Sequence, residues 1–181
     1  FSRYFNLVKS KAKKTLLQVD EKLVQLFKDS NFGDYIFSNN EKLPSFDIHC
    51  PLLSLPLKFS TTLKNIPFNE KYLYPNRDRI IMWKKIFNNQ FLNIGINWQA
   101  SPNPDLDIGR SFKLKYFNDI SSINKIKLYS LQKHNGLDQI NKKIKLNIID
   151  NFDESAPFVD TAAIIENLDL VITCDTSIAH L

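Results

Sequence analysis

Short apolar runs alternate with helical patterns along most of this chain, and that alternation limits the possible folds more than any other feature. Residues 15–19 and 34–37 are predicted strands, joined by a helix that Asp20 is placed to cap. A third strand is predicted over residues 46–49, and Pro51 suits the first turn of the helix that follows. Strands that alternate with helices in this way are typical of an α/β protein with a parallel sheet.

The second half of the chain also alternates predicted strands with predicted helices. Residues 60–76 lack periodicity and are predicted to form a linker, which an amphipathic helix over residues 77–88 follows. Further strands are predicted over residues 92–98, 127–131, 145–149 and 170–174, and helices over residues 114–120, 137–142 and 158–167. We therefore expect an N-terminal lobe over residues 1–66, a linker with its helix over residues 67–90, and a C-terminal lobe over residues 91–181.

The composition is ordinary for a globular protein and disfavours several classes. Of the 181 residues, 43% are hydrophobic and 24% charged, and the apolar runs are too short to cross a bilayer, so we expect no transmembrane segment. No secretory leader is visible at the start. The net charge of +5 comes from scattered lysines rather than a basic stripe with aromatics, so we expect no nucleic-acid partner. Cys50 and Cys174 stand far apart, which favours a reducing, cytoplasmic compartment.

Both ends of the chain carry helical patterns without a start or stop signal. Tyr4, Leu7 and Val8 already follow helical spacing near a first residue that is not methionine. The last residues, 177–181, contain no glycine or proline that would end a helix. We therefore expect a fragment of a longer protein, truncated at both termini.

The strongest candidate site follows the last predicted strand, where Asp175, Thr176 and Ser177 open a helix. Ligands of open parallel sheets bind beyond the carboxyl ends of the strands. A helix that starts there offers N–H groups and a partial positive charge to an anion such as a pyrophosphate. His180 follows Thr176 by four residues and is expected on the same helical face. The alternative is structural, because Asp, Thr and Ser are also common N-caps.

Two more polar stretches follow predicted strands and are expected at the same edge of the sheet. The long loop over residues 98–111 ends in Arg110 and Ser111, and an arginine can bind phosphate with two parallel hydrogen bonds. Gln132 and Lys133 come directly after the next strand. Each stretch alone also fits an exposed surface, but three polar strand ends at one edge predict a pocket.

His49, at the end of the predicted strand over residues 46–49, is a candidate general base, although a lone histidine there can also be structural. The chain has no Ser-His-Asp order and no cluster with metal-ligand spacing, so we expect no metal. With four glycines it has no GxGxxG or Walker pattern, and we expect no cofactor.

Four motifs, in order along the chain, resemble one known family. They are FDIHCPLLSLP at residues 46–56, GINWQASP at residues 95–102 with Arg110 and Ser111, SLQK at residues 130–133, and FVDTAAIIENLDLVITCDTSIAHL at residues 158–181. They resemble FDxHCPLLSLP, GLVWAGNP…RS, SLQKG and DFxDTAALIxxLDLVIxVDTAxAHL of bacterial glycosyltransferases that follow tetratricopeptide repeats. Those enzymes are similar to the heptosyltransferase-like glycosyltransferase family nine.

The resemblance implies a GT-B architecture, with two Rossmann-like lobes that here are both partial. It implies metal-independent transfer of a sugar from a nucleotide-sugar donor to a hydroxyl group of a protein, glycan or lipid acceptor. It also implies tetratricopeptide repeats upstream in the full-length protein, and a bacterial cytoplasmic or membrane-peripheral location.

The resemblance also implies roles for individual residues. The family's DTxxAHL segment lies at the donor phosphates, which corresponds to Asp175, Thr176, Ser177 and His180, with Ser177 in place of the usual alanine. By the same analogy Gln132 and Lys133 approach the donor, Arg110 and Ser111 line the cleft, and His49 faces the acceptor. A GD(A/T)IQ stretch of the family, with a candidate base, is absent, so the fragment alone is expected to be inactive.

Three other functions stay open. A non-catalytic relative would bind a nucleotide or a partner protein next to the helical repeats. An unrelated doubly wound nucleotide-binding protein, such as an epimerase, is disfavoured by the lack of a glycine-rich first turn. A nucleic-acid-binding module is the least favoured of the three.

Overall fold

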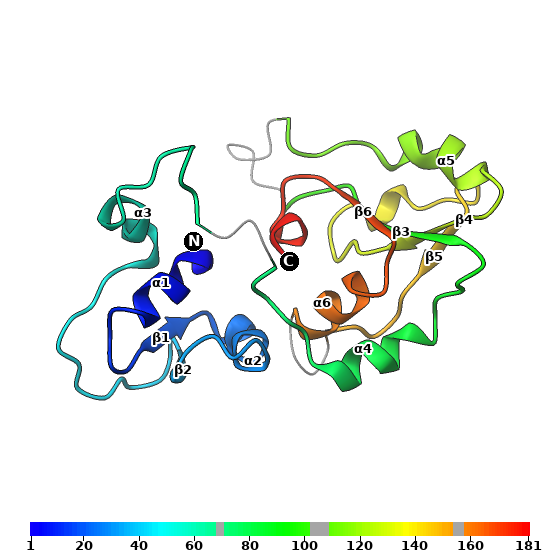
Figure 1. The fold of residues 1–181 in the computed structure, drawn as a ribbon. Coiled ribbons are helices and arrows are strands. Elements are labelled where there is room, and N and C mark those ends of the chain that lie inside the picture. Colours follow the sequence, from blue (N-terminus) through cyan, green and yellow to red (C-terminus); the bar gives the residue numbers. More distant parts are fainter. Residues whose placement is uncertain (68–70, 102–108, 154–157) are drawn as a thin grey trace. The chain divides into compact units, whose positions relative to one another are not determined.

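The computed structural model describes residues 1–67, 71–101, 109–153 and 158–181, which form two compact units (Figure 1). The first unit comprises Phe1–Asn76, and the second is built mainly from Arg77–Ser155 and Asp160–Leu181. Among the described residues, no helix combines the length and the apolar character that a membrane span requires.

The first unit contains a two-stranded parallel sheet. Strand β1 (Leu16–Val19) pairs with β2 (Tyr35–Ser38), and helix α2 (Glu21–Asp29) connects them. The carboxylate of Asp20 accepts the backbone N–H of Lys22 at 2.9 Å, so the predicted N-cap is confirmed. The other helical segments are η1 (Ser2–Tyr4), α1 (Phe5–Lys9), η2 (Leu52–Ser54) and α3 (Leu55–Lys58).

Asp34 ties the entry of β1 to the entry of β2. Its carboxylate accepts the hydroxyl of Thr15 at 2.8 Å and the Thr15 backbone N–H at 2.7 Å. These hydrogen bonds lower the pKa of Asp34 from its ordinary value of 3.8, and the bond from the Thr15 hydroxyl has the larger effect. The stability that they add is therefore present above that value and is lost as the pH falls through the lower pKa of the folded state.

The strand predicted over residues 46–49 is wrong, since this segment is irregular. Phe46 and Ile48 are 50% and 87% exposed, and His49 and Cys50 are exposed as well. Alternating apolar and polar residues satisfy the period of a strand, but a strand also needs a neighbour with which to pair. The helix predicted after Pro51 is confirmed by η2 and α3.

The second unit contains a four-stranded parallel sheet in the order β5-β4-β3-β6. The strands are β3 (Leu92–Asn97), β4 (Ile126–Ser130), β5 (Leu146–Ile148) and β6 (Leu170–Thr173). All four lie where the sequence predicts strands. The protein therefore belongs to the α/β class with parallel sheets, as expected.

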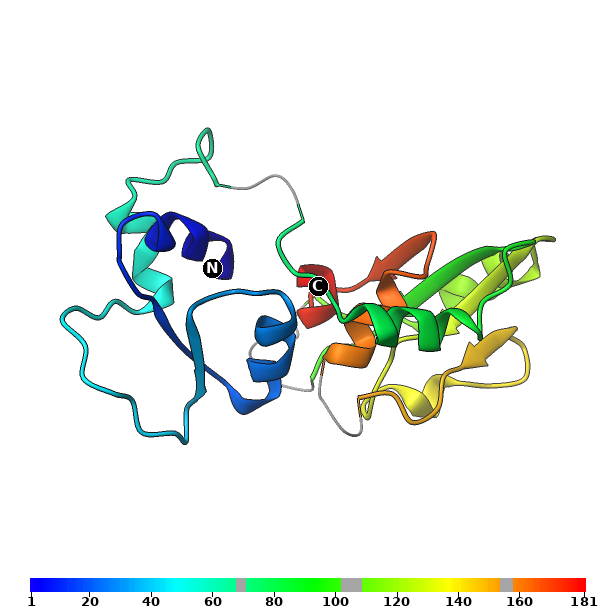
Figure 2. The same ribbon diagram turned by 60° about the horizontal axis from the view of Figure 1, so that its bottom comes forward.

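Helices cover both faces of this sheet (Figure 1). The segments η3 (Leu114–Phe117) and α5 (Asn118–Ser122) enclose one core, which includes the fully buried Ile96 and Leu128. Helices α4 (Arg77–Lys84) and α6 (Val159–Ile165) run side by side on the other face (Figure 2). Here a Cβ atom on Gly95 would lie 2.5 Å from the Leu168 side chain and 2.8 Å from that of Leu131, so a larger residue would require these leucines to shift.

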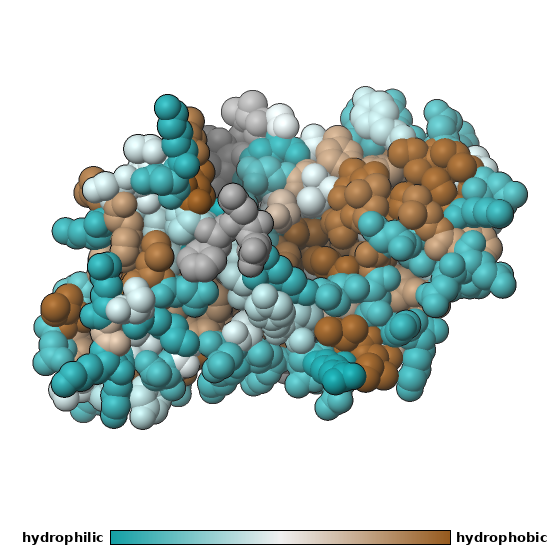
Figure 3. Space-filling model, in the orientation of Figure 1, coloured by the Kyte–Doolittle hydropathy of each residue, from teal (hydrophilic) through white to brown (hydrophobic). Residues whose placement is uncertain are grey.

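Two predicted helices are shorter than expected. Helix α4 ends at Lys84, and η4 (Leu137–Gln139) is one 3₁₀ turn where residues 137–142 were expected to be helical. The predicted amphipathic stripe of α4 is also incomplete, because Trp83 packs on the core while Ile81 is 53% exposed. Several hydrophobic residues of the second unit reach the surface, as Figure 3 shows.

Candidate functional site

Polar residues follow three neighbouring strands of the second unit at their carboxyl ends. Strand β3 lies between β4 and β6 and runs parallel to both. It ends at Asn97, β4 is followed by Gln132 and Lys133, and β6 is followed by residues 174–177. Because parallel strands end at the same edge, the topology brings these residues together, and we call this region the carboxyl edge.

Gln132 is a buried cross-link at this edge, with 6% of its surface exposed. Its Oε1 accepts the backbone N–H groups of Trp98 at 3.0 Å and Gln99 at 2.9 Å, and the Nδ2–H of Asn97 at 3.0 Å. Its Nε2 donates to the carbonyl of Gln99 at 2.8 Å. The side chain therefore fixes the loop after β3 against the loop after β4, in addition to any contact with a ligand.

Asn97 is a second cross-link, and the sequence analysis missed it. Its Oδ1 lies 3.2 Å from the hydroxyl of Thr173, 3.1 Å from that of Thr176 and 3.3 Å from the thiol of Cys174. Its Nδ2 donates to Gln132. One buried amide thus holds all three strand ends. The signal was present in the sequence, since an asparagine inside a buried apolar strand must find partners.

Arg110 and Asp175 meet at the carboxyl edge. The Nε of Arg110 donates to the carbonyl oxygen of Asp175 at 3.2 Å and lies 3.6 Å from its carboxylate. The side chains of Arg110 and Asp175 are 34% and 70% exposed, so solvent screens this pair. Ser111 accepts the backbone N–H of Ala100 at 3.0 Å. Residues 102–108 of the long loop lie outside the described residues.

Lys133 is held by a carboxylate of the second unit. Its Nζ donates to Asp153 Oδ2 at 3.1 Å and to the carbonyl of Phe152 at 2.9 Å, and it lies 4.0 Å above the Phe152 ring. The side chain of Asp153 is 6% exposed, and its Oδ1 accepts the backbone N–H of Thr161 at 2.9 Å. The charge of Lys133 is therefore compensated internally, while 35% of its side chain stays exposed.

Asp160 continues this polar network at the start of α6. It is 2% exposed, and it accepts Arg79 Nη1 at 3.0 Å, the Trp83 indole N–H at 2.9 Å and the Asp153 backbone N–H at 2.9 Å. Sequence reasoning did not single out Asp153 or Asp160. The network connects Asp153, the partner of Lys133, to the start of α6.

The helix predicted after Asp175 is a single 3₁₀ turn, η5 (Ser177–His180). Thr176 is its N-cap and turns its hydroxyl toward Asn97, while Ser177 and His180 are exposed. In a 3₁₀ helix residues three apart are eclipsed, so a spacing of four does not give a common face. The shared face predicted for Thr176 and His180 is therefore wrong in this geometry.

His49 belongs to the first unit, whereas the other candidates belong to the second. Its imidazole contacts the ring of Phe46 edge-on, with ring centroids 5.9 Å apart. Among the described residues, no three His, Cys, Asp or Glu side chains are grouped so that they could hold a metal ion.

Comparisons with known proteins identify no relative of this chain. No family model, no curated protein and no solved structure matches the chain. The basis for a function is therefore the chemistry of the carboxyl edge, where Arg110 contacts the turn after β6 and Lys133 follows β4.

Proposed function

We propose that the carboxyl edge binds the diphosphate of a nucleotide-sugar donor, and that the protein transfers the sugar to a hydroxyl acceptor without a metal. The observation that carries this proposal is the cross-linking of three strand ends by Asn97 and Gln132, which holds Arg110 and the turn after β6 at one edge. Open parallel sheets bind ligands at this edge. The resemblance of four sequence motifs to glycosyltransferases supplies the reaction.

Lys133 and Arg110 are the cations proposed to contact the phosphates. An ammonium group has three donors, and Lys133 uses two of them on Asp153 and Phe152, which leaves one for a phosphate oxygen. Arg110 contacts the turn after β6 by donating a hydrogen bond to the carbonyl oxygen of Asp175. Ser111, Ser177 and His180 are proposed to complete the donor site.

The proposed reaction is a displacement at the anomeric carbon. The acceptor oxygen forms the new glycosidic bond, the bond from the anomeric carbon to the diphosphate breaks, and the nucleoside diphosphate leaves with the electron pair. His49 is the proposed base that takes the hydroxyl proton. Preorganised donors at a developing charge contribute about 3–4 kcal/mol each to such a step.

Calorimetric titration with uridine, guanosine and adenosine diphosphates tests the donor site. We expect saturable binding of one of them, and a loss of about tenfold in affinity for Lys133→Ala and for Arg110→Ala. Lys142→Ala, an exposed lysine away from the carboxyl edge, is the control and should bind normally. Absence of binding by the folded protein, or equal affinity in all variants, would contradict the proposal.

Turnover is tested separately in the longer protein that the resemblance implies. Lys133→Ala and His180→Ala should both reduce sugar transfer severely, while Lys142→Ala should not. If both variants retain near-normal transfer, the proposed roles are wrong.

A non-catalytic nucleotide-binding module is the second candidate. It is favoured by the internal partners of Lys133 and Arg110, because a cation already paired contributes less to a leaving group. Nucleotide binding without transfer or donor hydrolysis in the longer protein would select this candidate.

A further inference from the structure

Segments η2 and α3 of the first unit bury one apolar side and expose another. The two segments are continuous, since α3 begins directly after Ser54. Leu55 is 5% exposed, and Phe59, which ends α3, packs against the buried Tyr4 with ring centroids 6.1 Å apart. Figure 1 shows α3 next to α1, the helix that Tyr4 precedes. These contacts fix the helical segment on the first unit.

The outer side of the same segment carries leucines instead of polar residues. Leu53 and Leu57 flank the buried Leu55, and they are 71% and 80% exposed. A surface helix that packs through one apolar side normally presents polar residues on the opposite side. Two leucines that the packing of the first unit does not use therefore face solvent.

A turn directly after α3 exposes a third leucine. Ser60 leaves the helix with a φ of 49°, and its carbonyl accepts the Nδ2–H of Asn65 at 3.3 Å. The Oδ1 of Asn65 accepts the hydroxyl of Thr62 at 3.0 Å. Leu63 lies within this hydrogen-bonded turn and is 92% exposed. The turn is thus tied to the end of α3 while its leucine projects into water.

Positive charge accompanies the exposed leucines. The exposed Lys58 follows Leu57, and the exposed Lys64 follows Leu63. Residues 48–66 contain no aspartate or glutamate. Within the part of the chain that the structure describes, neither lysine forms an ion pair. We call the region formed by Leu53, Leu57, Lys58, Leu63 and Lys64 the Leu-Lys surface.

We propose that the Leu-Lys surface binds the surface of an anionic lipid bilayer. The leucines enter the boundary between headgroups and acyl chains, and the two lysines contact the phosphates of anionic headgroups. The chain lies on the bilayer in this arrangement and does not cross it.

The composition of the Leu-Lys surface favours a bilayer over a protein partner. The cores of protein interfaces are depleted in lysine, and a symmetric dimer through this surface would bring the lysines of both copies together without an acidic residue between them. An anionic bilayer offers the apolar layer that the leucines need and the negative charge that the lysines need.

This inference does not depend on the proposed function. The Leu-Lys surface belongs to the first unit, whereas the carboxyl edge belongs to the second. Binding to a bilayer requires no nucleotide, and binding of a nucleoside diphosphate requires no lipid. Either proposal can therefore fail without the other.

Cosedimentation of the full chain with lipid vesicles tests the proposal. We expect binding to vesicles of phosphatidylcholine and phosphatidylglycerol that weakens at high salt, and binding at least about tenfold weaker to phosphatidylcholine alone. Leu57→Asn/Leu63→Asn should weaken binding at least about tenfold, because two apolar side chains no longer leave water. Lys58→Gln/Lys64→Gln should weaken binding to the anionic vesicles about tenfold.

Matched control variants lie in the second unit. Ile123→Asn/Leu137→Asn replaces two hydrophobic residues that are 52% and 42% exposed. Lys142→Gln/Lys143→Gln removes two exposed lysines and makes the same change in net charge as the lysine variant. Both controls should bind vesicles like the wild type, and circular dichroism checks that every variant is folded.

Three outcomes would overturn the proposal. The first is that the folded wild type does not sediment with the anionic vesicles. The second is that Leu57→Asn/Leu63→Asn binds them as the wild type does, or that the control variants lose as much affinity. The third is a lipid-free dimer that Leu57→Asn/Leu63→Asn dissociates, which would assign the Leu-Lys surface to a second copy of the chain.

Discussion

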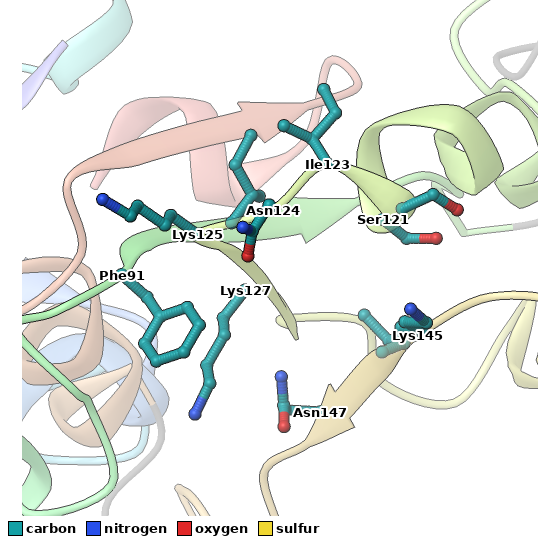
Figure 4. A pocket seen from close by; sticks show the side chains of 11 residues that line it. Phe91, Ser121, Ile123, Asn124, Lys125, Lys127, Lys145 and Asn147 are labelled. Atoms are coloured by element: carbon teal, nitrogen blue, oxygen red, sulfur yellow. The ribbon is translucent and has the colours of Figure 1, made fainter.

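The two ends of the four-stranded sheet differ in whether their polar side chains have partners within the protein. At the carboxyl edge Asn97 and Gln132 are buried and bonded on both sides, and the cation of Lys133 is paired with Asp153. At the amino end, where β4 and β5 begin, Lys125, Lys127 and Lys145 line a pocket, and the described residues that line it include no aspartate or glutamate (Figure 4). A ligand at the first end must compete with internal partners, whereas no carboxylate among the described lining residues competes for the lysines at the second.

The largest expected effect comes from Asn97→Ala, which removes the central cross-link of the carboxyl edge. The substitution removes the acceptor of the Thr176 hydroxyl and the Cys174 thiol and a bond to Gln132, while the Thr173 hydroxyl keeps the Cys174 carbonyl at 2.8 Å. Buried donors that lose a partner cost about 1–3 kcal/mol each, so we expect a loss of about 3 kcal/mol in the free energy of unfolding. Denaturant unfolding followed by circular dichroism measures it.

Asn147→Ala is the matched control at the other end of the sheet. Asn147 is exposed, and its Nδ2 makes one hydrogen bond, to the carbonyl of Leu128 at 2.8 Å. We expect a loss of about 1 kcal/mol or less. Equal losses in the two variants would mean that the buried amide is no more important than the exposed one, and the contrast between the two ends would be wrong.

The sequence was sufficient to predict the strands that the structure describes in both units, but it also predicted one strand, over residues 46–49, that does not form. Each strand of the four-stranded sheet is a short apolar run that is recognisable without knowledge of its neighbours, and β3 shows this for residues 92–97. The segment over residues 46–49 has the right alternation and still forms no strand. Pairing depends on a partner that is distant in sequence, and the local pattern does not report it.

The candidate site was predicted as a location but not as a set of contacts. Topology alone brings the strand ends together, so the edge followed from the strand order. The partner of Lys133 could not be predicted from the strand order, because Asp153 is 20 residues away and its backbone has a φ of 60°. The role of Asn97 could not be predicted either, because it depends on the register between β3 and β6.

A smaller effect is expected from Asp153→Asn, which removes the counter-charge of Lys133 and keeps the shape of the side chain. The carboxylate is buried but Lys133 is 35% exposed, so we expect a loss of about 1–2 kcal/mol in the free energy of unfolding. If Lys133 contacts the donor phosphates, its uncompensated charge should also strengthen nucleoside diphosphate binding. Unfolding and calorimetry together measure both quantities.

Opposite signs of these two effects are the informative result. Stability that falls while affinity rises would show that Asp153 and the phosphate compete for one ammonium group. Stability and affinity that fall together would mean that Asp153 only supports the loop. Asp150→Asn, an exposed carboxylate before the same loop, controls for the change in net charge and should alter neither quantity.

The smallest expected effect, from Lys145→Glu, has the opposite sign. A glutamate at this position places a carboxylate in a pocket that Lys125 and Lys127 also line, so the free energy of unfolding should rise by about 0.5 kcal/mol. The gain should shrink at high salt, because position 145 is exposed. Lys143→Glu makes the same change in net charge beside the pocket rather than in it. An equal gain in that control would assign the effect to the overall positive charge of the protein, and not to the lysines that line the pocket.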